Sequence, residues 1–221
     1  MIAKEGRLIL ISLLILLFPF GIYAHASNIK ILYYIYIFFG SFYLFAIYFF
    51  RDPQRKIASD SSAILSPADG RIISIETIND DEVGDSSKVI SIFLSVFDVH
   101  VIRYPFDGKV KSVKSCKGKF IAAFADNASD VNENIVTVIE ANNFIFKIKQ
   151  IAGLVARRII CYSKPNENVI KGDRMGFIRF GSRADIVVSS RIEVCVNIGE
   201  KVKAGESVIG KAKQWINAQL V

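Results

Sequence analysis

The sequence predicts a mostly β protein, an antiparallel barrel or sandwich, preceded by an N-terminal hydrophobic helical hairpin. Two patterns support this fold class. The first fifty residues contain two long runs without a charged residue, and the rest of the chain alternates short runs of β-branched and aromatic residues with Gly, Asn, Asp and Pro. Because no helix-length periodic segment dominates after residue 50, we expect strands at short spacing rather than alternating strands and helices.

The uncharged runs are residues 8–24, which contain Pro19, and residues 31–50, which are rich in Tyr and Phe. A bilayer core of about 30 Å takes about 20 apolar residues as helix, so the second run is long enough to span it and the first is marginal. A short link joins the two runs, and the resulting hairpin has both ends on one side. Basic residues flank these ends and predict that they are cytoplasmic: Lys4, Arg7, Arg51, Arg55 and Lys56.

Two other interpretations of the N-terminus stay open. One is a cleaved signal peptide. The cleavage signal Ala24-His25-Ala26 is weak and a second apolar run follows at once, and both facts argue against this interpretation. The other is a pair of helices that lie in the membrane interface, which the many tyrosines between Tyr33 and Tyr48 allow.

A formal net charge of +7 favours acidic partners, namely anionic lipid, phosphate or nucleic acid. Nucleic acid is the weakest of the three, because the basic residues are not interleaved with aromatic residues in one patch. Three cysteines, Cys116, Cys161 and Cys195, are widely spaced and include no CxxC. This pattern predicts small buried side chains in a reducing compartment rather than a disulfide framework or a zinc site.

After residue 50, apolar runs separated by turn residues predict a series of strands. The run at 89–97 is apolar almost throughout, so we expect it to be buried on both faces. Asn142 and Asn143 form a two-residue hairpin signal, because Asn tolerates a positive φ. A short helix is expected at 210–220. The predicted strands are 71–78, 89–97, 108–113, 135–141, 144–151, 154–162, 176–180, 185–188, 191–196 and 207–209.

Two segments, 67–72 and 198–206, look like the paired turns of biotinyl/lipoyl-type hybrid barrels. Neither contains a modifiable lysine between Met or Asp partners. We therefore interpret them as architecture only, a lipoyl-like hybrid feature of the β fold.

Residues suited to chemistry gather in four segments: FFRDPQR at 49–55, SPADG at 66–70, FLSVFDVHVIRYP at 93–105 and FGSR at 180–183. Each segment alone has a structural interpretation. The Asp-Gly and Gly-Ser pairs are natural turn residues, and a lone histidine at the end of a buried strand is more often a core residue. Arg51 and Arg55 are suited to contacts with lipid headgroups.

In combination, and in this order, the motifs FFRDPQR, SPADGRI, FDVHVIRYPFDG, QIAGLVARRI and KGDRMGFIRFGS resemble the short form of the phosphatidylserine decarboxylase family. The resemblance covers essentially the whole chain past Arg51. It implies an enzyme of phospholipid biosynthesis at the cell membrane. The basic residues that flank the hairpin predict that its catalytic domain is on the cytoplasmic side. It also implies conversion of phosphatidylserine into phosphatidylethanolamine through a Schiff base to a self-generated pyruvoyl group.

The same resemblance implies a proenzyme that cuts itself between Gly181 and Ser182. The products are a β chain, residues 1–181, and an α chain, residues 182–221, in which Ser182 has become the pyruvoyl cofactor; no metal is expected. Ser182 matches the nucleophile, His100 the general base and Asp69 the carboxylate that fixes the histidine tautomer. We divide the chain into a membrane-anchoring hairpin, 1–56, and a decarboxylase domain, 57–221.

Two positions depart from longer bacterial members of the family. Arg103 stands where those members carry a second histidine, and FGSR stands where they carry LGST. Both departures fit the short form, and they leave open whether His100 serves self-cleavage and protonation alike. Arg103 and Arg183 are candidate substrate-binding residues on residue type alone, because a guanidinium group binds carboxylate or phosphate.

Two alternative functions stay open. One is a decarboxylase of another seryl lipid, such as a lipid with ether-linked chains, which the sequence does not separate from the first. The other is a non-catalytic membrane adaptor with a lipoyl-like barrel, which predicts no self-cleavage and long coiled-coil heptads that the sequence lacks. The expected partners are phosphatidylserine, membrane lipid and the two chains of one proenzyme, with a homodimer as a further option.

Overall fold

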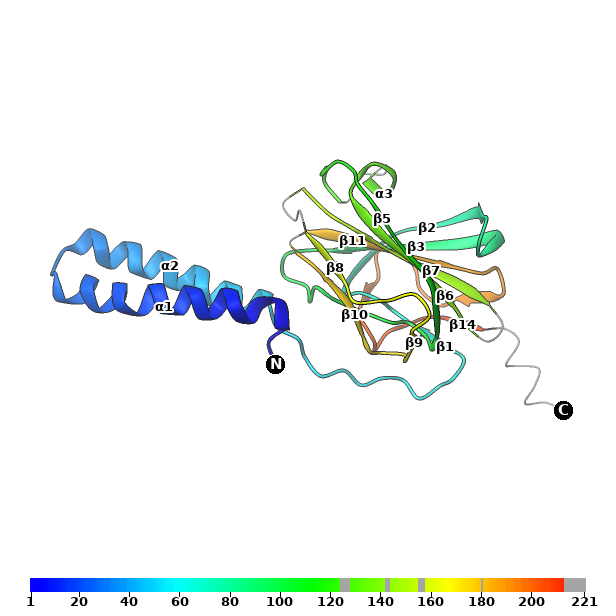
Figure 1. The fold of residues 1–221 in the computed structure, drawn as a ribbon, viewed down its shortest axis with the longest axis horizontal. Helices are drawn as coiled ribbons and strands as arrows, with labels where there is room; N and C mark the ends of the chain where they lie inside the picture. Colours follow the sequence, from blue (N-terminus) through cyan, green and yellow to red (C-terminus); the bar gives the residue numbers. More distant parts are fainter. Residues whose placement is uncertain (124–127, 142–143, 155–157, 180, 213–221) are drawn as a thin grey trace. The chain divides into compact units, whose positions relative to one another are not determined.

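The computed structural model describes residues 1–123, 128–141, 144–154, 158–179 and 181–212. The chain divides into two compact units, Met1–Gln54 and Arg55–Val221. The first unit contains two helices and the second contains the strands, as Figure 1 shows for each unit by itself. Arg55 is the first residue of the β unit.

The first unit is an antiparallel helical hairpin of α1 (Lys4–Ala26) and α2 (Lys30–Phe49). Hydrogen bonds tie its two ends together: the Ala3 N–H donates to the Phe50 carbonyl at 2.8 Å, and the Asp52 N–H donates to the Met1 carbonyl at 2.7 Å. The hairpin that the sequence predicts is therefore confirmed, with both ends on one side.

Both helices are long and apolar enough to cross a membrane. At 1.5 Å per residue they measure about 35 and about 30 Å, close to the thickness of a bilayer core. Their apolar side chains are mostly exposed, with Leu8 at 75% and Phe38 at 69%. A core helix of a soluble protein would bury these side chains, so the exposed surface is consistent with association with a membrane.

Eight strands of the second unit form one antiparallel sheet within the described residues (Figure 1). Each neighbouring pair in this sheet is antiparallel. The order is β13 (Lys201–Val202), β2 (Gly70–Asp80), β3 (Gly84–Leu94), β11 (Ser182–Val188), β7 (Ile145–Ile151), β6 (Asn134–Glu140), β5 (Gly108–Cys116) and β9 (Asn168–Val169).

Two smaller antiparallel sheets of three strands each complete the described part of the unit. The first runs β1 (Ala63–Leu65), β14 (Val208–Ala212) and β12 (Ile192–Val194). The second runs β4 (Val101–Arg103), β10 (Arg174–Ile178) and β8 (Ile159–Cys161). A single turn of helix, α3 (Ala128–Val131), precedes β6. The mostly β, antiparallel fold class is confirmed.

The hydrophobic core follows the inner faces of these sheets. Alternate residues of β3, Ile90, Ile92 and Leu94, are fully buried, as are Ala184 and Ile186 of β11. Because β11 lies between β3 and β7 and is buried at every position, it is the central strand of the fold. The chemistry expected at Ser182 therefore begins at the end of a fully buried central strand.

The two segments predicted as paired turns do pair. Lys201 and Val202 lie opposite Arg71 and Gly70. Farther along, the Gly205 N–H donates to the Ser66 carbonyl at 2.9 Å. This pairing holds the Ser-Pro-Ala-Asp-Gly segment between β1 and β2, which fixes the position of the aspartate in it.

The structure corrects several expected boundaries and exposures. The strand predicted at 185–188 begins at Ser182, and the strand predicted at 89–97 ends at Leu94 because the chain turns there, which leaves Phe97 exposed. Of the strand predicted at 154–162, only Ile159–Cys161 is a strand, and residues 155–157 lie outside the described ranges. Cys116 and Cys195 are exposed rather than buried.

Three further expectations fall at least partly outside the described ranges. Residues 210–212 belong to β14 rather than to a helix, because they pair with β1 and β12, and residues 213–220 lie outside the described ranges. The Asn142-Asn143 turn also lies outside them, although its flanking strands pair up to Glu140 and Ile145 as a hairpin requires. Phe180, of the strand predicted at 176–180, is likewise not described, and β10 ends at Ile178.

Candidate active site

The Gly181-Ser182 bond lies at one end of the large sheet, where three strands meet. Ser182 is the first residue of β11 and pairs with Leu94, the last residue of β3. On the other side, Arg183 pairs with Ile151, the last residue of β7. The segments that leave β3 and β7 therefore flank the bond that is expected to break.

Two other sequence motifs approach the same end of the sheet. The Ile178 N–H donates to the His100 carbonyl at 3.2 Å, so the histidine lies beside the strand that leads to Gly181. Gly70 lies so close to the Phe93 carbonyl that a methyl group there would overlap the oxygen. Asp69 thus enters the site beside the last residues of β3.

Ser182 has an unusual environment for a hydroxyl group. It is fully buried, and its Oγ has no hydrogen-bond partner among the described residues. A buried hydroxyl without a partner costs about 1–3 kcal/mol, so such groups in native proteins often serve a function. The preceding Gly181 has a φ of 55°, a left-handed conformation that favours glycine over residues with a side chain.

His100 is also fully buried, and its Nδ1 lies 2.9 Å from the backbone carbonyl of Asp98. A carbonyl oxygen can only accept, so Nδ1 carries the proton of this hydrogen bond. In the neutral ring the lone pair is then on Nε2, the form required of a general base at that nitrogen.

A closed turn presents this carbonyl to the histidine. Both the N–H and the Oγ of Ser95 donate to Oδ2 of Asp98, at 2.8 and 2.6 Å, and the Asp98 N–H donates back to the Ser95 carbonyl at 3.0 Å. The family resemblance predicts that Asp69 fixes the tautomer, whereas the hydrogen bond at Nδ1 is to the Asp98 carbonyl. The Ser-x-x-Asp spacing is a local turn signal that could have indicated this turn.

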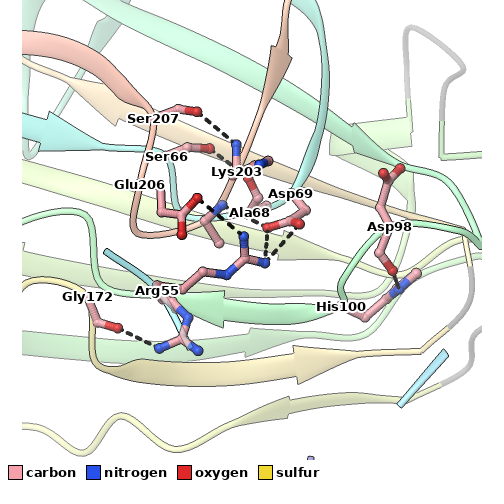
Figure 2. A network of polar contacts seen from close by, with 12 residues as sticks. Arg55, Ser66, Ala68, Asp69, Asp98, His100, Gly172, Lys203, Glu206 and Ser207 are labelled. Carbon is pink, nitrogen blue, oxygen red and sulfur yellow. Dashed lines mark hydrogen bonds and ion pairs between the residues drawn. The ribbon is translucent and has the colours of Figure 1, made fainter. Parts of the chain in front are cut away.

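Asp69 is held by a different group, Arg55. Nη2 of Arg55 donates to both carboxylate oxygens, at 2.8 and 2.9 Å (Figure 2). The Ala204 N–H donates to Oδ1 at 2.8 Å. Nη1 of the same guanidinium lies 3.9 Å from Glu206. The turn at 198–206 therefore brings a backbone N–H to Asp69 and a second carboxylate near Arg55.

Burial raises the pKa of the Asp69 carboxyl above its ordinary value, because charge is disfavoured away from water. Arg55 and the Ala204 N–H lower the pKa, and the nearby Asp98 charge raises it further, so that the net shift is upward. Arg55 is therefore the principal group that favours the ionised carboxylate.

Arg55 had been expected to contact lipid headgroups, and that expectation is wrong. Its side chain is 5% exposed and forms the buried ion pair with Asp69. Nothing in the local pattern signals this pair, because the two residues are fourteen positions apart and meet only after the β unit has folded.

The two arginines proposed for substrate binding are both buried. Nε of Arg183 donates to Asp185 at 2.7 Å, and Nη2 donates to Ser91 Oγ at 2.7 Å. Nη1 of Arg103 donates to the Gly172 carbonyl at 2.9 Å. Arg183 thus forms an internal network beside the cleavage position, whereas Arg103 lies on β4, three residues after His100.

Comparisons with known proteins agree with this arrangement. The family model described as phosphatidylserine decarboxylase matches residues 42–210. Relatives named phosphatidylserine decarboxylase proenzyme include one from Geobacter metallireducens, 40% identical over 83% of this chain and 85% of its own length. The relative from Desulfotalea psychrophila is 43% identical over 84% of this chain and 86% of its own length. The relative from Ralstonia pickettii is 45% identical over 76% of this chain and 79% of its own length. On this match, which spans most of the chain and includes the segments that meet at the end of β11, the protein belongs to the phosphatidylserine decarboxylase family.

Proposed function

We propose that this phosphatidylserine decarboxylase makes its own pyruvoyl group from Ser182, after self-cleavage of the Gly181–Ser182 bond. The observation that supports this most directly is the buried Ser182 hydroxyl, which has no partner in the described part of the chain and follows directly after a glycine in a left-handed conformation. A serine in a plain turn would donate to a neighbouring backbone group or to water. The family match supports the reaction, and the local geometry supports the position.

The cleavage chemistry explains why these two residue types stand together. Ser182 Oγ attacks the Gly181 carbonyl carbon, a C–O bond forms, the C–N bond breaks, and the hydroxyl proton passes to the nitrogen, which gives an ester. A base then removes the α-proton of residue 182, the Cβ–O bond breaks, and Gly181 leaves as a carboxylate. The dehydroalanine left behind tautomerises and is hydrolysed to a ketone and ammonia.

His100 is the proposed base. Its Nδ1–H is held by the Asp98 carbonyl, so that Nε2 accepts the proton from the serine hydroxyl or the α-carbon. Asp69, paired with Arg55, contributes a buried carboxylate near the Asp98 turn. We propose that this negative charge favours the imidazolium that His100 becomes when it takes the proton.

In the mature enzyme the pyruvoyl ketone supplies an electrophile for the amine of the lipid serine and an electron sink as carbon dioxide leaves. The chain's own residues then hold the substrate and return a proton. His100 is the candidate that donates this proton to the carbon that lost carbon dioxide. Arg103 is the candidate that binds an anionic group of the substrate, because its guanidinium suits a carboxylate or phosphate. Its backbone N–H donates to the Pro67 carbonyl, which places Arg103 close to the Asp69 segment.

We further propose that the helical hairpin anchors the enzyme in the cell membrane, with the β unit on the cytoplasmic side. The exposed apolar faces of α1 and α2 support an anchor. The basic residues at both ends of the hairpin support the orientation. An anchor of this kind keeps the active site near its lipid substrate, whose headgroup carries a net negative charge.

The mass of the purified protein under denaturing conditions tests the proposal. We expect two fragments divided between Gly181 and Ser182, the smaller with a blocked N-terminus, and release of phosphatidylethanolamine from phosphatidylserine vesicles. Ser182→Ala should give one intact chain without activity. An intact wild-type chain with full activity would refute the proposal, and a chain that is cut but inactive on phosphatidylserine would direct attention to another seryl lipid.

A further inference from the structure

Asn132 is a buried side chain that the proposed mechanism does not use. Its carboxamide nitrogen donates to the Ile121 carbonyl at 2.9 Å and to the Ala152 carbonyl at 2.8 Å, and its oxygen accepts from the Ile121 N–H at 2.9 Å. Both N–H donors are therefore used inside the protein, where only 1% of the residue is exposed. A polar group satisfied in this way fixes the segments it joins.

One of these segments begins where β7 ends. Ile151 is the last residue of β7 that pairs with β6 and β11, and the chain then leaves the sheet. Ala152 is nevertheless held on both sides, because its N–H donates to the Glu133 carbonyl at 3.0 Å and its carbonyl accepts from Asn132. The carboxamide thus fixes the backbone where the regular strand pairing ends.

The next residue, Gly153, lies against the bond that is to be cut. A methyl group at Gly153 would overlap the carbonyl oxygen of Gly181 and lie 2.9 Å from its carbonyl carbon. Both are backbone atoms, which cannot move aside as the end of a flexible side chain could. At Gly181, by contrast, no atom of the described residues lies within 4 Å of an added methyl group, and the reason for glycine there is the positive φ. Space therefore demands a glycine at 153, whereas conformation demands one at 181.

We infer that Asn132, acting through Ala152 and Gly153, is a positioning residue for the scissile Gly181 carbonyl during self-cleavage. This inference rests on the proposed cleavage between Gly181 and Ser182. Attack by Ser182 Oγ requires the carbonyl carbon at a fixed distance and angle, and the Gly153 backbone restricts where the carbonyl oxygen can lie. Once the bond is cut, Gly181 becomes the end of the β chain and this carbonyl no longer takes part.

The inference predicts a separation between processing and turnover. Gly153→Ala should slow self-cleavage about 100-fold or more, the scale expected when a reacting group moves by about 1 Å. Asn132→Asp should slow it about tenfold, because a carboxylate keeps the bond from the Ile121 N–H but cannot donate to the two carbonyl groups. Decarboxylation per processed molecule should stay within about threefold of the wild type in both variants.

Processing is followed in the full chain, synthesised in the presence of detergent or vesicles, by the loss of the intact mass over time. Turnover is measured on phosphatidylserine and divided by the amount of the small fragment with a blocked N-terminus. Hydroxylamine cleaves esters but not amides. Both variants are expected to be slowed before the ester forms, so their uncut chains should resist hydroxylamine. Gly108→Ala is the matched control, because a methyl group there would also meet a backbone carbonyl, that of Glu140, at 2.7 Å.

The outcomes separate the possibilities. Slow processing with near-normal turnover per processed molecule, and normal processing in Gly108→Ala, would support the positioning role. Parallel loss of processing, turnover and protease resistance in the Asn132 and Gly153 variants would show a structural tie only and overturn the inference. Normal processing in both variants would overturn it too. A wild-type chain that is never cut at Gly181 would instead refute the proposed function itself.

Discussion

Arg55 donates from one guanidinium nitrogen to both carboxylate oxygens of Asp69, at 2.8 and 2.9 Å, and both side chains are nearly enclosed. Arg55 is the first residue of the β unit and ends the FFRDPQR motif, which begins at Phe49, the last residue of α2. The aspartate that the family resemblance places in the active site is thus neutralised by a residue that the sequence assigned to the membrane surface. This ion pair joins the FFRDPQR and SPADG motifs, which are separate in the sequence.

Replacing Arg55 tests the importance of this pair. Arg55→Ala leaves the Asp69 carboxylate buried without its cation, which is expected to cost about 3–5 kcal/mol of unfolding free energy. Self-cleavage should also slow at least about tenfold. Without Arg55 the Asp69 carboxylate is protonated more readily, and it then no longer carries the negative charge that favours the His100 imidazolium. Denaturant unfolding in detergent and the rate of loss of the intact chain measure the two effects.

A second charged pair provides the control for Arg55. Lys114 is 68% exposed and lies 3.9 Å from Glu82, so Lys114→Ala should change the unfolding free energy by less than about 1 kcal/mol. The double variant Arg55→Ala with Asp69→Asn removes the buried charge and should recover part of the lost stability without recovering cleavage. Equal stability of Arg55→Ala and Lys114→Ala would contradict the role given to the buried pair.

The Ser95–Asp98 turn predicts a second effect on self-cleavage. Ser95→Ala removes the 2.6 Å bond from the hydroxyl to the Asp98 carboxylate but keeps the one from the backbone N–H. A hydrogen bond to a charged group is worth about 1.5–3 kcal/mol, so looser placement of the Asp98 carbonyl should slow cleavage about tenfold. Ser95→Thr retains a hydroxyl and should restore most of the rate, measured as the half-time of the intact chain.

A displaced histidine tautomer also leaves a pH signature. If the Asp98 carbonyl no longer holds the Nδ1 proton, the rate of cleavage in Ser95→Ala should have a different dependence on pH from that of the wild type. A uniformly lower rate with an unchanged pH profile would indicate that the turn acts on the fold alone and would weaken the assignment of Nε2 as the base.

The sequence could predict the fold class and the segments of the site because both depend on local signals. Uncharged runs of helical length identify the hairpin, and short apolar runs separated by turn residues identify most strands. The strand boundaries around the site were less predictable. Ser182 was placed in a turn because Gly-Ser is a turn pair, yet it pairs with Leu94 and begins the central strand. Tertiary pairing overrides the local preference there.

The contacts inside the site were not predictable for a related reason. Arg55 meets Asp69, and Gly153 meets Gly181, only after distant segments have been brought together by the sheet. Neither contact leaves a periodic or compositional trace in the sequence. The histidine partner was missed for a different reason: a backbone carbonyl, which every residue possesses, replaces the carboxylate expected from the family pattern.

Tyr104 predicts a loss of stability at high pH. Its hydroxyl lies 2.6 Å from Ser163 Oγ, and burial raises the pKa of Tyr104 from 10.0 to about 12. The folded state therefore holds the phenol proton more tightly than the unfolded state does. The resulting stabilisation is complete below pH 10 and is lost as the pH rises through about 12.

Tyr104→Phe removes this titration and provides the measurement. At pH 8 the wild type should be about 1 kcal/mol more stable, because the variant leaves Ser163 without its partner. Between pH 10 and pH 12 the advantage should shrink or reverse by up to about 3 kcal/mol, the scale of a hundredfold change in proton affinity. Urea unfolding followed by circular dichroism at several pH values tests this, and parallel curves for the two proteins would contradict it.

Arg183 provides the last prediction, because its position argues for a structural role beside Ser182. Its Nε bonds to Asp185, whose other carboxylate oxygen accepts from Ser129 at 2.8 Å, and both members of the pair are more than nine-tenths buried. Arg183→Ala should therefore cost about 3–5 kcal/mol of unfolding free energy.

Replacing both charges, with Arg183→Met and Asp185→Leu, should restore most of that stability, because no buried charge is then left uncompensated. If Arg183 only ties the start of β11 into the sheet, this double variant should turn over phosphatidylserine with a KM within about twofold of the wild type once the amount of processed chain is equalised. A KM raised tenfold or more in the stable double variant would instead return Arg183 to the substrate-binding site.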